Sequence, residues 1–267
     1  MIIYGSRMYG KRNVINGWGE CEHCGAYGKN SSYNGRKWGH LYFIPLIPMG
    51  ESVRVLNECK ACSNGSHLPE SDVTEVLEEL RNDIQKALAR LIEGEKNFGY
   101  HETELPCTLF LANNIEVVKC LDDQNLVDLV VAALKEKELH YPHHMVNGRL
   151  LEFQGKLQEA GTAYQQAATE EPEDILPIIS LGAIYFKQKE YEAARLAYEK
   201  ALESLESQER LQILGVLLSV YELQKDFTAL TDTYEECLQL VPEYAQDKPF
   251  MKGYKKACKK AGREPVK

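Results

Sequence analysis

No stretch of the sequence is apolar for long enough to cross a bilayer. The best candidate, LYFIPLIPMG at residues 41–50, contains two prolines and has about half of the ~20 residues that a spanning helix needs. The first residues, MIIYGSRMYGKR, lack the charged start, apolar core and cleavage site of a secretion signal. The phosphate-binding pattern G-x-x-x-x-G-K-[ST] is also missing. We therefore expect a cytoplasmic protein that has no membrane span and is not an enzyme.

Positive charge is scarce in the body of the chain. The 267-residue sequence carries 31 Lys/Arg against 40 Asp/Glu, a formal net charge of −9. Residues 71–242 contain 15 basic and 32 acidic residues, whereas residues 1–70 and 243–267 have net charges of +3 and +5. An acidic body repels a phosphate backbone, so nucleic-acid binding is not expected there, and only the two ends keep that option open.

Four of the eight cysteines form two C-x-x-C pairs, Cys21/Cys24 and Cys59/Cys62. Because cytosolic thiols stay reduced, such pairs are typical of a metal site, and four thiolates are a donor set that Zn²⁺ prefers. The 34 residues between the pairs exceed the common spacing of about 15–20. Doubling a loop costs only about 0.6 kcal/mol, however. Residues 36–47 and 52–58 have strand composition, which predicts two strands with the pairs at their ends.

A thioredoxin-like redox centre is one alternative for the cysteine pairs. It would place one C-x-x-C at the start of a helix, and neither pair directly precedes a helical pattern. Four unliganded structural cysteines are a further alternative. Four cysteine ligands leave no open coordination position, so the predicted metal site is structural rather than catalytic.

The successive segments CEHCG, RKW, FIPLIPMG and CKAC resemble a zinc-ribbon family over about residues 1–65. The resemblance implies that Cys21, Cys24, Cys59 and Cys62 bind one structural Zn²⁺. It implies no enzymatic activity and no further biochemical role.

Residues 73–91 predict an amphipathic helix. Its apolar positions 73, 77, 80, 84, 87 and 91 alternate by four and three, as in a coiled-coil seam. A seam shorter than about three heptads packs more often within its own chain than on a partner. Self-association through this helix is the alternative. A further helix is expected within residues 122–139.

A repeat of 34 residues begins at residue 141. Small and aromatic residues recur at the same spacing in two copies: Gly148, Ala160, Tyr164 and Ala167, then Gly182, Ala194, Tyr198 and Ala201. The pattern resembles the tetratricopeptide repeat, in which two helices approach at the small residues and the aromatic ring fills the space between them. The match is closer over residues 141–204 than over 209–243, and a lysine-rich helix is expected to cap the end of the array.

The tetratricopeptide resemblance implies a concave groove, lined by the first helix of each hairpin, that binds peptides. The groove residues it implies are Arg149, Phe153, Phe186, Lys187 and Glu222. Arg149 and Lys187 are the candidates for binding a carboxylate. Members of the family that clamp carboxylates use asparagines at set positions, where this sequence has Val146 and Arg149 in the first unit, so that partner class is not implied.

These observations predict a mainly α protein in which a small β zinc ribbon precedes a tetratricopeptide-like helical solenoid. The expected parts are residues 1–70 (ribbon), 71–140 (helical region), 141–243 (repeats) and 244–267 (capping helix). The expected function is a non-enzymatic zinc-binding adaptor with a protein or peptide partner. The alternatives are a nucleic-acid-associated factor that uses the ribbon and the basic tail, and a redox-regulated chaperone-like protein that releases zinc on oxidation.

Overall fold

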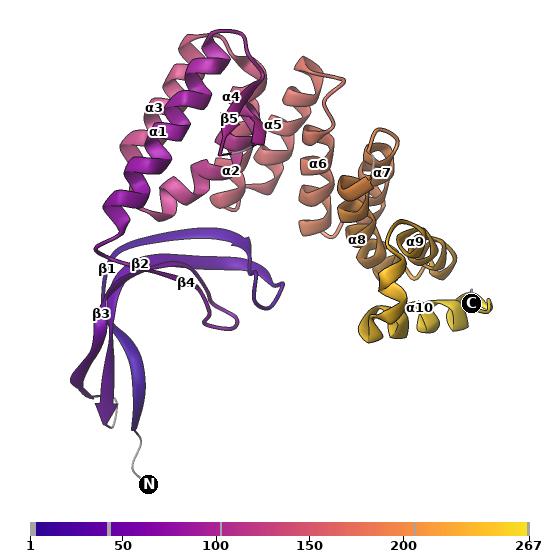
Figure 1. Ribbon diagram of the computed structural model, residues 1–267, viewed down its shortest axis with the longest axis horizontal. Coiled ribbons are helices and arrows are strands. Elements are labelled where there is room, and N and C mark those ends of the chain that lie inside the picture. Colours follow the sequence, from indigo (N-terminus) through magenta and orange to yellow (C-terminus); the bar gives the residue numbers. More distant parts are fainter. Residues whose placement is uncertain (1–3, 42–43, 102, 206, 266–267) are drawn as a thin grey trace. The chain divides into compact units, whose positions relative to one another are not determined.

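A computed structural model describes residues 4–41, 44–101, 103–205 and 207–265 (Figure 1). The chain forms two compact units, Met1–Glu170 and Glu171–Lys267. The predicted boundaries at residues 70, 140 and 243 stay a prediction. Within the described ranges, no helix combines the length and the apolar character needed to span a bilayer.

The N-terminal part of the first unit is an antiparallel sheet of four strands, β1 (Tyr4–Glu20), β2 (Tyr27–Leu41), β3 (Ile44–Cys59) and β4 (Ser66–Pro69), hydrogen-bonded in that order. The predicted fold class is therefore wrong in its first part, because three of these strands have 15 to 17 residues and form more than a small two-stranded ribbon. Residues 4–35 are rich in Gly, Asn and Ser, which have low strand propensity. Their strand conformation comes from pairing with neighbouring strands.

The chain reverses direction inside the run that was predicted as one strand, residues 36–47. Leu41 of β2 pairs with Ile44 of β3, and the intervening Tyr42 and Phe43 lie outside the described residues. Pro45 and Pro48 favour an edge position or a bend, since proline has no N–H for the ladder. β4 pairs with β3 only from Val53 to Leu56, so both prolines lie where β3 pairs with β2 alone.

The rest of the first unit alternates helices with a small second sheet. The elements are α1 (Val73–Ile92), β5 (Asn97–Tyr100), β6 (Thr103–Pro106), α2 (Cys107–Cys120), α3 (Gln124–Glu136), α4 (His140–Phe153) and α5 (Leu157–Glu170). The antiparallel pair β5–β6 also corrects the expected helical region, because strands continue within it. The second half of the predicted seam in α1 is buried in its own unit at Ile84, Ala87 and Leu91, while self-association through this helix stays a prediction.

Arg54 of β3 is the largest fully buried side chain of the described residues. Its guanidinium donates from Nε and Nη2 to the carbonyl oxygen of Cys120 at 2.8 and 2.7 Å, and from Nη1 to the carbonyl oxygen of Asn13 at 2.8 Å. Cys120 ends α2, where unpaired carbonyls carry partial negative charge, so a cation is favourable there. Arg54 thereby ties β3 to the C-terminal end of α2 and to the residue-13 bend of β1.

The second unit consists of α6 (Leu176–Lys187), α7 (Tyr191–Leu202), α8 (Ser207–Gln224), α9 (Phe227–Leu240), the 3-10 turn η1 (Pro242–Gln246) and α10 (Lys248–Ala261). Its core includes Tyr198 of α7, Leu217 and Val220 of α8, Leu230 of α9 and Ala257 of α10. The predicted terminal helix is present as α10, which packs on α9 through rings 4.9 Å apart, Tyr234 and Phe250.

The repeated glycines meet the repeated tyrosines in both copies. A Cβ placed on Gly148 would lie 2.5 Å from the ring of Tyr164, and one placed on Gly182 would lie 2.8 Å from the ring of Tyr198. Gly148 and Tyr164 belong to α4 and α5, and Gly182 and Tyr198 to α6 and α7. Each pair lets one helical hairpin close tightly, which is the packing that the 34-residue period predicts.

Arg54→Met should destabilise the protein by about 3 kcal/mol, because it leaves buried carbonyl oxygens without a donor. The control is Arg36→Met, since Arg36 is exposed and its side chain donates to the carbonyl oxygen of Gly50 at the surface; it should stay within about 1 kcal/mol of wild type. Urea unfolding followed by circular dichroism measures both. Equal midpoints for the two variants would contradict the role given to Arg54.

Gly182→Ala should destabilise the second unit by about 2 kcal/mol, because the added methyl group collides with the Tyr198 ring. Gly215, in α8, is the matched control, since a Cβ there meets nothing within 4 Å. Gly215→Ala should instead stabilise by roughly 0.5–1 kcal/mol through helix propensity. Thermal unfolding of the two variants should therefore shift in opposite directions, and a shift in the same direction would refute the packing argument.

Candidate metal centre

The four paired cysteines meet at one point. The sulfur atoms of Cys21, Cys24, Cys59 and Cys62 all lie within 4.8 Å of one another. The Cys21–Cys62 distance is 3.6 Å and the Cys24–Cys59 distance is 3.9 Å. Sulfurs around a tetrahedral ion with metal–sulfur bonds of about 2.3 Å are ~3.8 Å apart, whereas a disulfide requires about 2.05 Å. The residues therefore fit a four-coordinate metal ion.

Strand pairing brings the two cysteine pairs together. The first pair lies in the turn between β1 and β2. In the second pair, Cys59 ends β3 and Cys62 lies in the turn between β3 and β4. Since β2 and β3 are neighbours, Cys59 pairs with Asn30 in the sheet, and the Lys60 amide donates to the Lys29 carbonyl at 3.4 Å. The residues between the two cysteine pairs thus contain the β2–β3 hairpin, and the open end of this hairpin lies at the metal centre.

Both cysteine turns have the same backbone geometry. Gly25 N donates to Cys21 O at 2.8 Å, and Ser63 N donates to Cys59 O at 2.8 Å. These donors have positive φ angles of 65° and 58°, respectively. Glycine adopts such angles freely and serine does so at some cost. Gly65 follows the second pair but is not the donor of its turn. It allows a close approach of the backbone, since a Cβ there would lie 2.8 Å from the Leu56 carbonyl oxygen.

A backbone amide favours a thiolate at one position of the cluster, whereas the crowding of four sulfurs raises the pKa of another. The Ala61 amide points at Cys59 Sγ, at 3.3 Å, and supports a thiolate at that position. A backbone hydrogen bond at Ala26 lowers the pKa of Cys24, but burial and the three neighbouring thiols outweigh it and raise that pKa to about 11. A bound divalent cation would reverse this balance by deprotonating the thiols, so metal binding releases protons.

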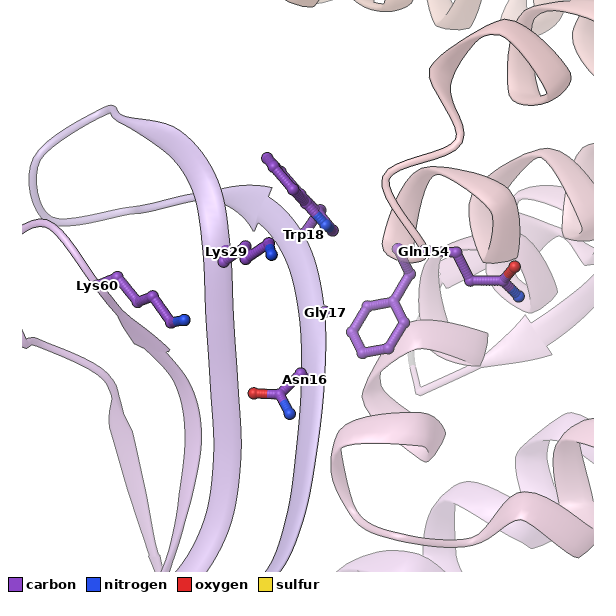
Figure 2. A pocket seen from close by; sticks show the side chains of 7 residues that line it. Asn16, Gly17, Trp18, Lys29, Lys60 and Gln154 are labelled. Atoms are coloured by element: carbon purple, nitrogen blue, oxygen red, sulfur yellow. The ribbon is translucent and has the colours of Figure 1, made fainter.

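A cavity of about 320 Å³ lies beside the second cysteine turn and is lined by Asn16, Gly17, Trp18, Lys29, Lys60, Phe153 and Gln154. Figure 2 shows Trp18 and Lys29 on the strands and, across the cavity, Gln154, which follows the last residue of α4. Its lining combines two ammonium groups, two amides and two aromatic rings, which suits a ligand with an apolar body and a negative charge. Lys60 stands inside the second C-x-x-C pair, so an occupied metal centre would fix the backbone on that side.

Two aromatic rings cover glycines where β1 meets α4. The Phe153 ring lies against Gly17, so closely that any Cβ there would collide with it, and the Trp18 ring lies within 2.6–2.9 Å of a Cβ placed on Gly155. Gly155 follows the end of α4 and has a φ of 76°. Among the seven lining residues, the sequence patterns singled out only Phe153. The one signal for the others was the position of Lys60 between two cysteines.

The predicted groove residues fall in both units. Arg149 donates to the side chain of Asn113 at 3.0 Å and lies 3.6 Å from Glu152, and Phe153 is 4% exposed. In the second unit, Phe186 packs partly buried against the core, and its ring centroid is 5.8 Å from that of Tyr191. Lys187 is half-buried and Glu222 pairs with Lys256 at 2.9 Å. A peptide-binding role for these five residues stays a prediction.

The tetratricopeptide repeat family matches residues 178–204, which cover most of α6 and all of α7. Curated proteins yield no match to the chain. The expected tetratricopeptide resemblance is therefore confirmed for this hairpin, and the zinc-ribbon resemblance of residues 1–65 stays a prediction.

Cys59→Ser should abolish stoichiometric metal binding and lower the melting temperature, because a four-thiolate site loses a ligand that also contributes to folding. Cys258→Ala is the control, since Cys258 is equally buried in α10 and lies outside the cluster. The control should keep the metal content of wild type. Elemental analysis of protein purified under reducing conditions gives the stoichiometry and the identity of the metal. Equal metal content in the two variants would exclude the site.

Proposed function

We propose that this protein is a non-enzymatic adaptor, in which a structural Zn²⁺ orders the β-sheet and helical repeats bind a protein partner. The observation that carries the proposal is the tetratricopeptide match over residues 178–204, because this repeat is a general protein-interaction motif. The proposal includes a cytoplasmic location, where the four thiols stay available for a metal.

The proposal of zinc rests on the donor set and its geometry. Soft thiolate ligands in a tetrahedral arrangement select Zn²⁺ over Mg²⁺ or Ca²⁺, which prefer oxygen ligands. Four cysteine ligands would close the coordination shell and leave no position for a substrate or an activated water, which supports a structural role. Such an ion would hold the β1–β2 turn against the β3–β4 turn, at the end of the sheet where Lys60 also lines the cavity.

The proposed partner surface in the second unit is the exposed side of α6 and α8, the first helices of their hairpins. Lys187 ends α6, and Leu223 near the end of α8 is 49% exposed. Lys187 and Leu223 thus supply one charged and one apolar side chain to this surface. A peptide could pair a carboxylate with Lys187 and bury an apolar side chain against Leu223.

The amount of partner protein recovered with the double variant Lys187→Glu/Leu223→Ser should be at least about tenfold lower than with wild type, because the variant reverses one charge and removes one apolar contact. The matched control is Leu196→Ser/Lys200→Glu on α7, the second helix of the same hairpin as α6, where Leu196 is 54% exposed. Quantitative mass spectrometry of affinity-purified complexes compares the two variants with wild type. If both variants recover the same proteins as wild type, the proposed surface is wrong.

A further inference from the structure

The C-terminal helix α10 presents a row of lysines to solvent. Lys248, Lys252, Lys255 and Lys259 follow one another at spacings of four, three and four residues, so they share one face of the helix. All four are exposed. The row extends over about 17 Å at 1.5 Å per residue.

Three other cationic side chains among the described residues at this end of the chain are already engaged. Lys256 pairs with Glu222 at 2.9 Å, the ammonium of Lys260 lies 4.3 Å from the Phe227 ring centroid, and Arg263 pairs with Glu235 at 3.0 Å. The four lysines of the row, in contrast, form no ion pair with the described residues. Like charges three and four residues apart repel each other, so the row weakens the isolated helix. Lys259, in the last turn, is placed to stabilise the helix dipole, but helix stability does not account for the rest of the row.

An open hollow of about 410 Å³ adjoins the row and is lined by Ala245, Gln246, Asp247, Lys248, Met251, Lys252 and Lys255. Met251 and the aliphatic stems of the lysines give the hollow apolar walls between the charges. The one carboxylate of the lining, Asp247, accepts the Phe250 amide at 2.8 Å as the N-cap of α10. The surface thus offers several positive charges around a recess that can hold an apolar side chain.

We propose that the lysine face of α10 binds a short acidic peptide segment of a partner protein, with one apolar side chain of that segment in the hollow. Charge complementarity requires an anionic partner. The recess beside the charges favours a peptide, because a nucleic-acid backbone has no apolar side chain to place there. The length of the row matches a segment of about eleven helical residues.

The surroundings of α10 disfavour the other polyanions. The aromatic residues of the helix lie on its packed side, where the Tyr254 ring is 5.9 Å from the ring of Tyr234, so none stands among the lysines to stack on a base. Residues 171–242 carry 14 Asp/Glu against six Lys/Arg and would repel a nucleic acid longer than the row. The apolar face needed for insertion into a membrane is buried at Tyr254, Ala257 and Cys258.

The test uses the full chain and a fluorescein-labelled peptide of about fourteen residues, all Glu and Asp except for one central Leu. Fluorescence anisotropy should show binding that weakens as salt is added. Lys248→Gln/Lys252→Gln/Lys255→Gln/Lys259→Gln should reduce the affinity by at least about tenfold. The matched control, Lys135→Gln/Lys137→Gln/Lys200→Gln/Lys225→Gln, removes the same charge from exposed lysines elsewhere and should stay within about twofold of wild type.

Two further measurements distinguish the contribution of the hollow to binding from that of the charges, and test whether the variants stay folded. Met251→Gln, or a probe with Ser in place of the central Leu, should bind several-fold more weakly than the parent pair. The milder double variant Lys252→Gln/Lys259→Gln should give an intermediate loss while keeping the wild-type circular dichroism spectrum. Because it removes repulsion, the quadruple variant should melt no lower than wild type.

The proposal is overturned if wild type does not bind the peptide, if the quadruple variant and its control bind equally, or if only a single-stranded RNA of the same length or phosphatidylserine vesicles bind. It is independent of the α6/α8 surface. The variant Lys187→Glu/Leu223→Ser should bind this peptide as wild type does, and loss of binding there would assign the peptide to the other surface.

Discussion

Hydrogen bonding between β2 and β3 is the constraint on which the metal centre depends. It places the β1–β2 turn beside the β3–β4 turn, and the pairing of Asn30 with Cys59 sets how closely they approach. Once the two turns are adjacent, four sulfurs fall at the separations of a tetrahedral shell. A one-residue slip in this register would turn alternate side chains to the other face of the sheet and scatter the cluster.

The same sheet is joined to the first helices by a small number of buried contacts. Arg54 reaches the last carbonyl of α2, and the side chain of Cys120 donates to Asn57 in β3 at 3.2 Å. Phe153 and Trp18 add aromatic cover over two glycines at the end of α4. These contacts place one wall of the cavity on the strands and another on α4, so the metal centre and the cavity share the scaffold of the first unit.

The second unit is organised differently, by repetition. The α6–α7 hairpin closes on the contact between Gly182 and Tyr198, and α10 covers the side of α9 that would otherwise be exposed. Covering the last hairpin uses only one face of α10. The opposite face is free to carry charge, and in a unit that is otherwise acidic its four lysines create a local field of the opposite sign.

The sequence by itself determined the four clustered cysteines, the 34-residue repeat with its glycine–tyrosine pairs, and the terminal lysine-rich helix. These features depend on residue type and spacing over one or two local elements. Only the tertiary structure decided that β1 to β4 form one four-stranded sheet, that β5 and β6 pair within the expected helical region, and that α4 begins at His140. Strands poor in β-branched residues take their conformation from the strands they pair with, which a local pattern does not reveal. Pro142 lies in the first turn of α4, where its missing N–H costs no hydrogen bond, so this proline does not mark the end of a helix. The roles of Arg54, Trp18 and Lys29 were decided in the same way, because each depends on residues brought together by the pairing of distant segments.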